Sequence, residues 1–183
     1  MSNKHRQHGA GLEFNSMGKT NRQPLAHVII GFIGSGKTTF AKKLEQETGA
    51  LRFTKDEWMI SIFGHDPTID RFATYDNRVS KLAVDVAMYC LKAGNDVIID
   101  EGFWVRSQRD EIRQKLEKAG AKVQLYYVKN THETMKQRVS KRNQKPTVDA
   151  FVISQEMYDG YKKYFEEPVP EEKCYTIENM EEK

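Results

Sequence analysis

The feature that most constrains this chain is the glycine-rich stretch from Gly31 to Thr38, with the sequence GFIGSGKT. It follows the apolar run 28–30 and precedes residues that favour a helix. The order strand, glycine-rich turn, helix is the context that a phosphate-binding P-loop requires. Glycines let backbone amides converge on phosphate oxygens, and the helix N-terminus adds a partial positive charge. The stretch therefore predicts a nucleoside triphosphate site.

The residue types inside the loop predict how it holds a nucleotide. The ammonium group of Lys37 can reach the outer phosphates, and the hydroxyl of Thr38 can ligate Mg²⁺. We therefore expect ATP as the nucleotide and Mg²⁺ as the cofactor. The predicted nucleotide-binding residues of the loop and first helical turn are Gly34, Ser35, Gly36, Lys37, Thr38 and Thr39.

Length and charge bound the domain organisation and the partners. A chain of 183 residues is the size of one domain. Residues 1–24 carry four basic side chains and one acidic one, which accounts for the whole net charge of +3. This polar stretch has no hydrophobic period, so we expect a disordered tail or a cloning tag. Residues 25–183 carry 25 basic and 25 acidic side chains, and a neutral body offers no electrostatic drive toward nucleic acid.

Cysteine usage and hydropathy suggest the compartment. Cys90 and Cys174 form neither a disulfide framework nor a metal-ligand pattern, which fits a reducing environment. No apolar run approaches the roughly 20 residues of a membrane span. We expect a cytoplasmic protein that does not bind membranes, and the sequence gives no signal for its oligomeric state.

Apolar strands alternate with amphipathic helices along the chain. The predicted strands cover residues 28–30, 51–54, 97–99, 123–128 and 174–177. The helices follow the P-loop and then cover 55–63, 75–93, 107–119, 131–142 and a tyrosine-rich stretch before Pro168, with a loop at 65–70. We expect a capping box from Ser107 to Asp110 and an N-cap at Asn130. This alternation predicts an α/β fold with a parallel sheet covered on both faces, whose ligands bind at the carboxyl ends of the strands.

Two acidic residues fall at such strand ends. Asp100 ends an apolar strand like a Walker B acid, which would hold Mg²⁺; the alternative is a capping or surface carboxylate. Asp56 follows the second strand and could take the proton from an attacking hydroxyl. The alternative is that Asp56 and Glu57 only cap the next helix.

Basic residues suggest a lid and an acceptor site. Arg138 and Arg142 lie four residues apart on one helix face, before the polar stretch 143–149. Such a cluster at about 138–152 would serve as a phosphoryl-transfer lid, with Arg142 catalytic; the alternative is a solvated helix face. Arg106 and Arg109 follow the third strand and could anchor the substrate or only aid solubility.

These segments together resemble the small P-loop kinases of the adenylate kinase superfamily. The resemblance is greatest to AAA-type predicted kinases near polynucleotide kinase and zeta toxin, and it covers about residues 25–180. Its motifs are the Walker A loop at 31–38, the segments FTKDEW at 53–58 and IIDEGFW at 98–104 with Arg109 downstream, and RVSKR at 138–142.

The resemblance implies a three-layer P-loop NTPase fold with five parallel strands in the order 2-3-1-4-5. It also implies ATP with Mg²⁺, Asp56 as the base, Arg138 stacking on adenine and Arg142 contacting phosphates. Adenylate kinase has Asp-Gly-Phe-Pro-Arg after the third strand, whereas here Glu101 intervenes and Trp104 replaces the proline. This departure speaks against a nucleoside monophosphate as acceptor.

We expect a phosphotransferase that moves the γ-phosphate of ATP to a hydroxyl of a small molecule. Candidate pocket residues are Trp58, Phe63, Arg71, Tyr75, Arg78, Trp104 and Arg106, of which the aromatic ones could equally belong to the core. Three alternatives stay open: a polynucleotide 5′-hydroxyl kinase or zeta-toxin-like kinase, a GTPase switch, and a non-catalytic nucleotide-binding regulator.

Overall fold

The computed structural model describes residues 22–65, 69–145 and 150–178. Five parallel strands form one sheet in the order β2-β3-β1-β4-β5. The strands are β1 (Leu25–Ile30), β2 (Leu51–Thr54), β3 (Val97–Gly102), β4 (Lys122–Lys129) and β5 (Tyr175–Glu178). The predicted fold class and strand order are confirmed.

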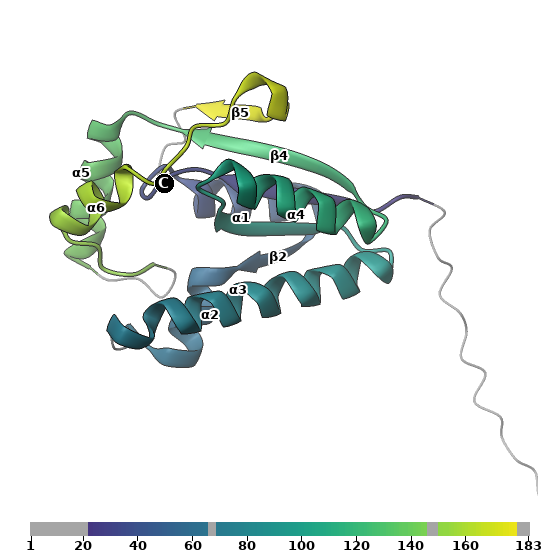
Figure 1. Ribbon diagram of the computed structural model, residues 1–183, viewed down its shortest axis with the longest axis horizontal. Helices are drawn as coiled ribbons and strands as arrows, with labels where there is room; N and C mark the ends of the chain where they lie inside the picture. The colour runs from purple at the N-terminus through teal and green to yellow at the C-terminus, as the bar shows by residue number, and fades with distance from the viewer. Residues whose placement is uncertain (1–21, 66–68, 146–149, 179–183) are drawn as a thin grey trace, which may run out of the picture.

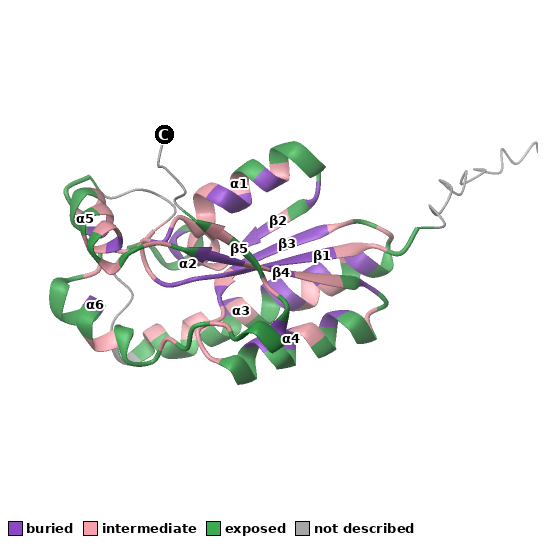
Figure 2. Ribbon diagram, turned by 90° about the horizontal axis from the view of Figure 1, so that it is seen from above, coloured by how far each residue is buried: buried purple, intermediate pink, exposed green. Residues whose placement is uncertain are grey.

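Helices cover both faces of the sheet. Helix α1 (Lys37–Thr48) lies on one face, and α3 (Ile69–Lys92) and α4 (Arg106–Lys118) lie on the other (Figure 2). Helix α2 (Lys55–Phe63) follows β2 directly. Helices α5 (His132–Asn143) and α6 (Gln155–Lys162) lie together at one end of the molecule, the end toward which β4 points (Figure 1). A short 3₁₀ helix at Pro170–Glu172 precedes β5.

The apolar alternation of the strands builds two cores. On one face, Ile29 and Ile98 pack against Phe40, Ala41 and Leu44 of α1. On the other face, the neighbouring residues of the same strands pack against α3 and α4, and this cluster includes Val28, Ile30, Val97, Ile99, Ala83, Ala87 and Leu116. Each large aliphatic side chain buried in this way contributes about 1.5–3 kcal/mol. The sheet is thus a rigid base whose carboxyl edge carries the polar residues.

A third cluster connects the P-loop to the end of the molecule occupied by α5 and α6. Phe32 of the loop packs with Met135 and Val139 of α5 and with Tyr158 of α6, and all four side chains are buried. Its ring also lies 5.4 Å from the ring of Trp104. The hydrophobic side chain of the loop therefore fixes α5 and α6 relative to the phosphate-binding backbone.

Three local expectations differ from the structure. Helix α3 begins at Ile69, not Tyr75. Residues 71–78 are exposed or half-buried, so no buried apolar stripe marks this part of the helix in the sequence. The N-cap of α5 is Thr131, not Asn130, since the Thr131 hydroxyl accepts from the Thr134 amide at 3.2 Å. Helix α4 begins at Arg106, so the expected box is shifted and the side-chain oxygen of Gln108 accepts from the Val105 amide at 3.4 Å.

The domain limits can be followed only within the described residues. Residues 1–21 of the expected tail lie outside them, whereas Arg22 pairs with Asp96 at 2.8 Å and Gln23 donates to the Gly120 carbonyl. Of the expected lid, residues 146–149 lie outside the described part. Within residues 22–65, 69–145 and 150–178, no helix combines the length and apolar character needed to cross a bilayer.

Candidate active site

The loop between β1 and α1 has the tight backbone that a phosphate site needs. Gly34 and Gly36 adopt φ values of 76° and 100°, which side chains rarely allow. A Cβ at Gly34 would stand 2.6 Å from the Met135 carbonyl, and one at Gly31 would stand 2.6 Å from the Val128 carbonyl. Glycine is therefore required at these positions, because the loop is packed tightly against α5 and β4.

Lys37 begins α1 and lies above the loop. Its ammonium group donates to the Phe32 carbonyl at 3.0 Å. Burial lowers the pKa of Lys37, while the carboxylates of Asp100 and Asp56 act in the opposite direction and Arg142 lowers it further. The charges of Asp56, Asp100 and Arg142 thus act on the lysine of the loop.

Thr38 and Asp100 form the candidate metal site. The Thr38 hydroxyl donates to Asp100 Oδ2 at 2.8 Å, and the Asp100 side chain is buried at the end of β3. Burial raises the pKa of Asp100, and the nearby Lys37 ammonium group acts in the opposite direction. The two residues predicted to hold the metal are therefore in contact.

Two residues of β2, Thr54 and Arg52, form a polar network with Asp100. Neither was predicted from the sequence. The buried Thr54 hydroxyl lies 3.5 Å from Asp100 Oδ2 and also accepts from the Arg52 guanidinium. Arg52 in turn pairs with Glu45 at 2.8 Å and Glu57 at 3.0 Å. The position of Thr54 opposite Asp100 in the β2–β3 register is the signal that could have identified it.

Asp56 lies in the first turn of α2, at the mouth formed by the strand ends. Its charge helps to raise the pKa of Lys55 and partly opposes the burial that lowers the pKa of Lys37. Lys55 pairs with Asp76 of α3 at 2.7 Å. Burial alone would lower the pKa of Lys55, but the charges of Asp76 and Asp56 more than offset this and leave it raised. The predicted base therefore follows the end of β2 and is next to Lys55, whose ammonium group pairs with Asp76.

Glu101 adds another acidic side chain to this charged region, on the side that faces α3. Its Oε2 accepts from the Ser80 hydroxyl at 2.5 Å. Burial raises the pKa of Glu101 to about 6, and the Ser80 hydrogen bond acts in the opposite direction. Ser80 and Asp76 were not predicted as site residues, because nothing in the α3 sequence distinguishes them from a solvated helix face.

The two arginines of α5 approach the loop from the expected lid. Arg138 donates to the Ser35 carbonyl at 3.4 Å, and Arg142 donates to the Phe151 carbonyl at 3.3 Å. The ring of Phe151 packs against Phe72 at the start of α3, with centroids 5.2 Å apart. Phe151 thus contacts both Arg142 of α5 and Phe72 of α3.

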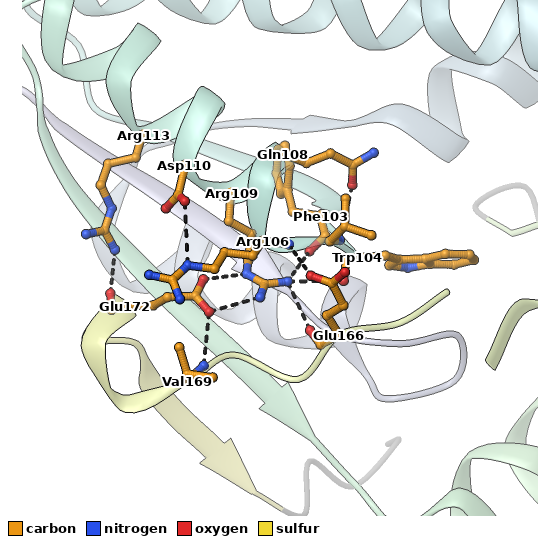
Figure 3. A network of polar contacts seen from close by, with 11 residues as sticks. Phe103, Trp104, Arg106, Gln108, Arg109, Asp110, Arg113, Glu166, Val169 and Glu172 are labelled. Atoms are coloured by element: carbon orange, nitrogen blue, oxygen red, sulfur yellow. Dashed lines mark hydrogen bonds and ion pairs between the residues drawn. The ribbon is translucent and has the colours of Figure 1, made fainter. Parts of the chain in front are cut away.

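Arg109 lies in a different environment from the predicted one (Figure 3). Its guanidinium group is 1% exposed and pairs with Glu172, with Nε–Oε2 at 2.6 Å and Nη2–Oε1 at 2.9 Å. Its Nη1 donates to the carbonyls of Phe103, Trp104 and Glu166 at 3.0–3.2 Å. Since all three nitrogens have partners in this buried network, Arg109 holds the C-terminal segment and does not fit an acceptor contact.

The other predicted acceptor residues in this region lie in three different settings. Arg106 is half-exposed at the start of α4, where its side chain lies 3.6 Å from Asp110. Trp58 packs against Phe53 and Trp104 packs against Phe32, so both indoles belong partly to the core. Phe63 and Tyr75 stack on each other at 4.1 Å between α2 and α3.

The residues present fit a nucleotide with Mg²⁺. The buried Ser35 hydroxyl has no hydrogen-bond partner within the described residues, as expected of a group that awaits a ligand. Thr38 and Asp100 supply a hydroxyl and a carboxylate, the hard oxygen donors that Mg²⁺ prefers. The described part of the chain has no cluster of three or more His, Cys, Asp or Glu side chains suited to a metal. Phosphate oxygens and water would therefore complete the coordination.

Comparisons with known proteins agree with this geometry. Residues 27–168 match the family model described as an AAA domain. Similar solved structures include a sugar kinase from Janibacter sp. HTCC2649, with 21% identity, coverage of 85% of this chain and 84% of that chain, and a TM-score of 0.57. A gluconokinase from Sinorhizobium meliloti 1021 shares 15% identity over 86% of this chain and 83% of that chain, with a TM-score of 0.59.

A third similar structure contains a bound nucleotide. Kti12 from Chaetomium thermophilum, in complex with ADP-AlF3, shares 19% identity over 85% of this chain and 89% of that chain, with a TM-score of 0.64. No curated protein matches the chain significantly. The chain belongs to the AAA domain family matched over residues 27–168, and its fold is that of the P-loop kinase group.

Proposed function

We propose that this chain is an ATP-dependent kinase that transfers the γ-phosphoryl group of ATP to a hydroxyl of a small molecule. The observation that best supports this proposal is that the P-loop and two acidic residues meet at the carboxyl ends of neighbouring strands. The hydroxyl of Thr38, next to Lys37, donates to Asp100 at the end of β3, and Asp56 follows the end of the adjacent strand β2. The kinase fold supports nucleotide-dependent phosphotransfer in general.

Each side chain has a distinct part in the proposed reaction. The loop amides and Lys37 bind the phosphates, while Arg138 and Arg142 neutralise charge on the nucleotide side. The Asp56 carboxylate accepts the proton as the O–H bond of the acceptor breaks. The new O–P bond forms as the bond between the γ-phosphorus and the bridging oxygen breaks, and ADP leaves. Asp56 then carries the proton until it exchanges with solvent.

The metal has a limited part in this scheme. Thr38 and Asp100 would hold Mg²⁺, which supplies neutralisation of phosphate charge when bound. The protein provides the positions of these two oxygens, and Thr54 keeps Asp100 in place from behind.

The proposed acceptor is a small molecule and not a nucleic acid. The equal numbers of basic and acidic residues in 25–183 give no general attraction for a polyanion. Arg106 remains a proposed acceptor contact because its side chain is half-exposed beyond the end of β3.

A transfer screen with labelled ATP across classes of hydroxylated metabolites tests this function. We expect Lys37→Ala to lose nucleotide-dependent turnover, because the phosphates lose their main cation. We expect Asp56→Asn to bind ATP normally but to lose transfer by about 10²–10⁴-fold, the usual contribution of a general base. Lys43→Ala and Asp85→Asn, at solvated positions on α1 and α3, are the matched controls.

Two outcomes would contradict the proposal. Undiminished transfer in Asp56→Asn would remove that residue from the mechanism. Slow ATP hydrolysis that no acceptor stimulates, and that Asp56→Asn does not change, would indicate a nucleotide-binding regulator instead of a kinase.

A further inference from the structure

An extra residue interrupts the pairing of β3 with β1. Ile29 pairs with Asp100 and Ile30 pairs with Gly102, so Glu101 is a bulge between them. Bulges occur next to active sites, where they redirect a side chain. Here the bulge leaves Asp100 in contact with Thr38 of α1, while Glu101 contacts Ser80 of α3. Asp100 therefore contacts the helix on one face of the sheet, and Glu101 contacts a helix on the other face.

The carboxyl group of Glu101 is only half satisfied by the protein. Oε2 accepts from Ser80, but Oε1 is buried and has no hydrogen-bond partner within the described part of the chain. A buried carboxylate oxygen without a donor is costly, and such atoms in a native structure need an explanation. A donor from a bound molecule would supply the missing hydrogen bond.

The charged groups around Glu101 limit the kind of bound molecule that could carry this hydrogen-bond donor. Lys55 and Asp56 begin α2 directly after β2, the strand that pairs with β3, and Asp76 lies one helical turn before Ser80 on α3. Lys55 is already paired with Asp76 at 2.7 Å, so its charge is largely balanced. Arg71 and Arg78, the other basic residues on this part of α3, are exposed. The carboxyl groups of Glu101, Asp56 and Asp76 outnumber the single ammonium group of Lys55. This excess of negative charge disfavours an acceptor that carries a phosphate and favours one with hydroxyl or ammonium donors.

We propose that Glu101 is an acceptor-binding residue, whose Oε1 accepts a hydrogen bond from a second hydroxyl or an amino group of the molecule that Asp56 activates. The acceptor then belongs to the uncharged or cationic polyols and amino alcohols and carries no phosphate. This inference rests on the proposed kinase function. It adds selectivity, because a site built to bind a polar hydrogen strongly rejects an analogue that lacks it.

The experiment compares acceptor classes in wild type and in Glu101 variants. The probes are neutral sugars and alditols, amino sugars, the deoxy analogue of each active compound, sugar phosphates and AMP, all with ATP and Mg²⁺. Glu101→Gln keeps the shape of the side chain and a partner for Ser80, whereas Glu101→Ala removes both oxygens. Glu117→Ala on the exposed face of α4 is the matched control.

We expect wild type to prefer a neutral or cationic acceptor. Glu101→Ala should raise the acceptor KM by about 10–100-fold, the loss expected for a hydrogen bond to a charged group, and should leave the KM for ATP within about threefold. Glu101→Gln should give a smaller increase, and neither variant should affect the deoxy analogue that lacks the second donor. Acceptor binding to the protein loaded with a non-hydrolysable ATP analogue should weaken in parallel.

Three results would overturn the inference. Preferred transfer to AMP or a sugar phosphate would contradict the acceptor class, and an unchanged acceptor KM in both variants would contradict the role of Glu101; in either case the kinase function would survive. If no acceptor stimulated ATP consumption by wild type, the proposed function itself would fail and the inference with it.

Discussion

At the scale of single residues, Gly34 of the P-loop and Gly49 at the C-terminal end of α1 differ in what an added side chain would meet. Gly34 has a φ of 76° and would place a Cβ against the backbone of α5, whereas Gly49 has a φ of 70° with nothing within 4 Å. Gly34→Ala and Gly49→Ala therefore share a backbone cost of about 1–2 kcal/mol but differ in collision. Comparing the two variants therefore separates the cost of the left-handed backbone from the cost of the steric collision.

We predict that Gly34→Ala loses ATP binding and unfolds at lower urea concentration than Gly49→Ala. The reason is that the Met135 carbonyl cannot move without shifting α5, so the loop itself must distort. Nucleotide titration and urea unfolding measure the two effects. Equal stability and equal ATP affinity in the two variants would show that the loop has more room than the structure indicates.

Site residues could be predicted from the sequence where a short local motif determines their role. The P-loop residues and Asp100 follow from motif and strand position, and the Thr38–Asp100 contact agrees with that prediction. The structural position of Arg109 could not be predicted, because its partner Glu172 lies 63 residues away and an arginine after a strand has the same local pattern in either role. The bulge at Glu101 was equally hidden, since register is set by the neighbouring strand.

At the scale of elements, the Arg109–Glu172 pair attaches the segment before β5 to α4 (Figure 3). Burial alone would raise the pKa of Glu172, but hydrogen bonds from Arg109 and the Val169 amide more than offset this and leave it below its ordinary value. A carboxyl group with a lowered pKa binds its proton more weakly in the folded state. Its stabilisation is therefore present above the unfolded pKa and is lost as the pH falls through the folded value.

We predict that the free energy of unfolding of wild type falls below about pH 4.5 and that Glu172→Gln shows less of this acid dependence. At neutral pH the variant should lose about 3–5 kcal/mol, because the buried guanidinium group keeps no charged partner. Urea unfolding across pH 3–7 measures both. Glu117→Gln, which changes an exposed carboxylate on α4, should leave the profile unchanged; an identical acid slope in Glu172→Gln would contradict the assignment.

Helix positions were predictable where a helix packs on the sheet and less so elsewhere. The apolar stripe of α3 indicated its packed part but not its first turns, where Phe72 packs against Phe151. Packing that depends on distant segments leaves no period in the local sequence.

At the scale of the whole molecule, a bound nucleotide should stabilise the fold, because α1, β3 and α5 all border the site. A ligand at 100 times its dissociation constant adds about 2.7 kcal/mol to the free energy of unfolding. We predict that ATP with Mg²⁺ raises the melting temperature, and that a chelator removes part of this increase in wild type. Asp100→Asn should show a smaller increase and little response to the chelator. An equal chelator effect in both proteins, measured by thermal denaturation, would place the metal elsewhere.

The nearly balanced charge of the folded part of the chain predicts weak binding to polyanions. Binding to nucleic acid through phosphates falls steeply with salt, with a log–log slope of about −0.7 per contact on single strands. Because residues 22–183 carry 26 basic and 25 acidic side chains, a variant lacking residues 1–21 should bind a labelled 5′-hydroxyl oligonucleotide weakly at 50 mM salt and show almost no slope up to 200 mM. Fluorescence anisotropy measures this, with the full chain as the comparison because it retains the basic N-terminal residues. Submicromolar binding by the shortened variant, with a steep salt slope, would require a local basic groove strong enough to act despite the neutral whole, and would favour a polynucleotide acceptor over a small molecule.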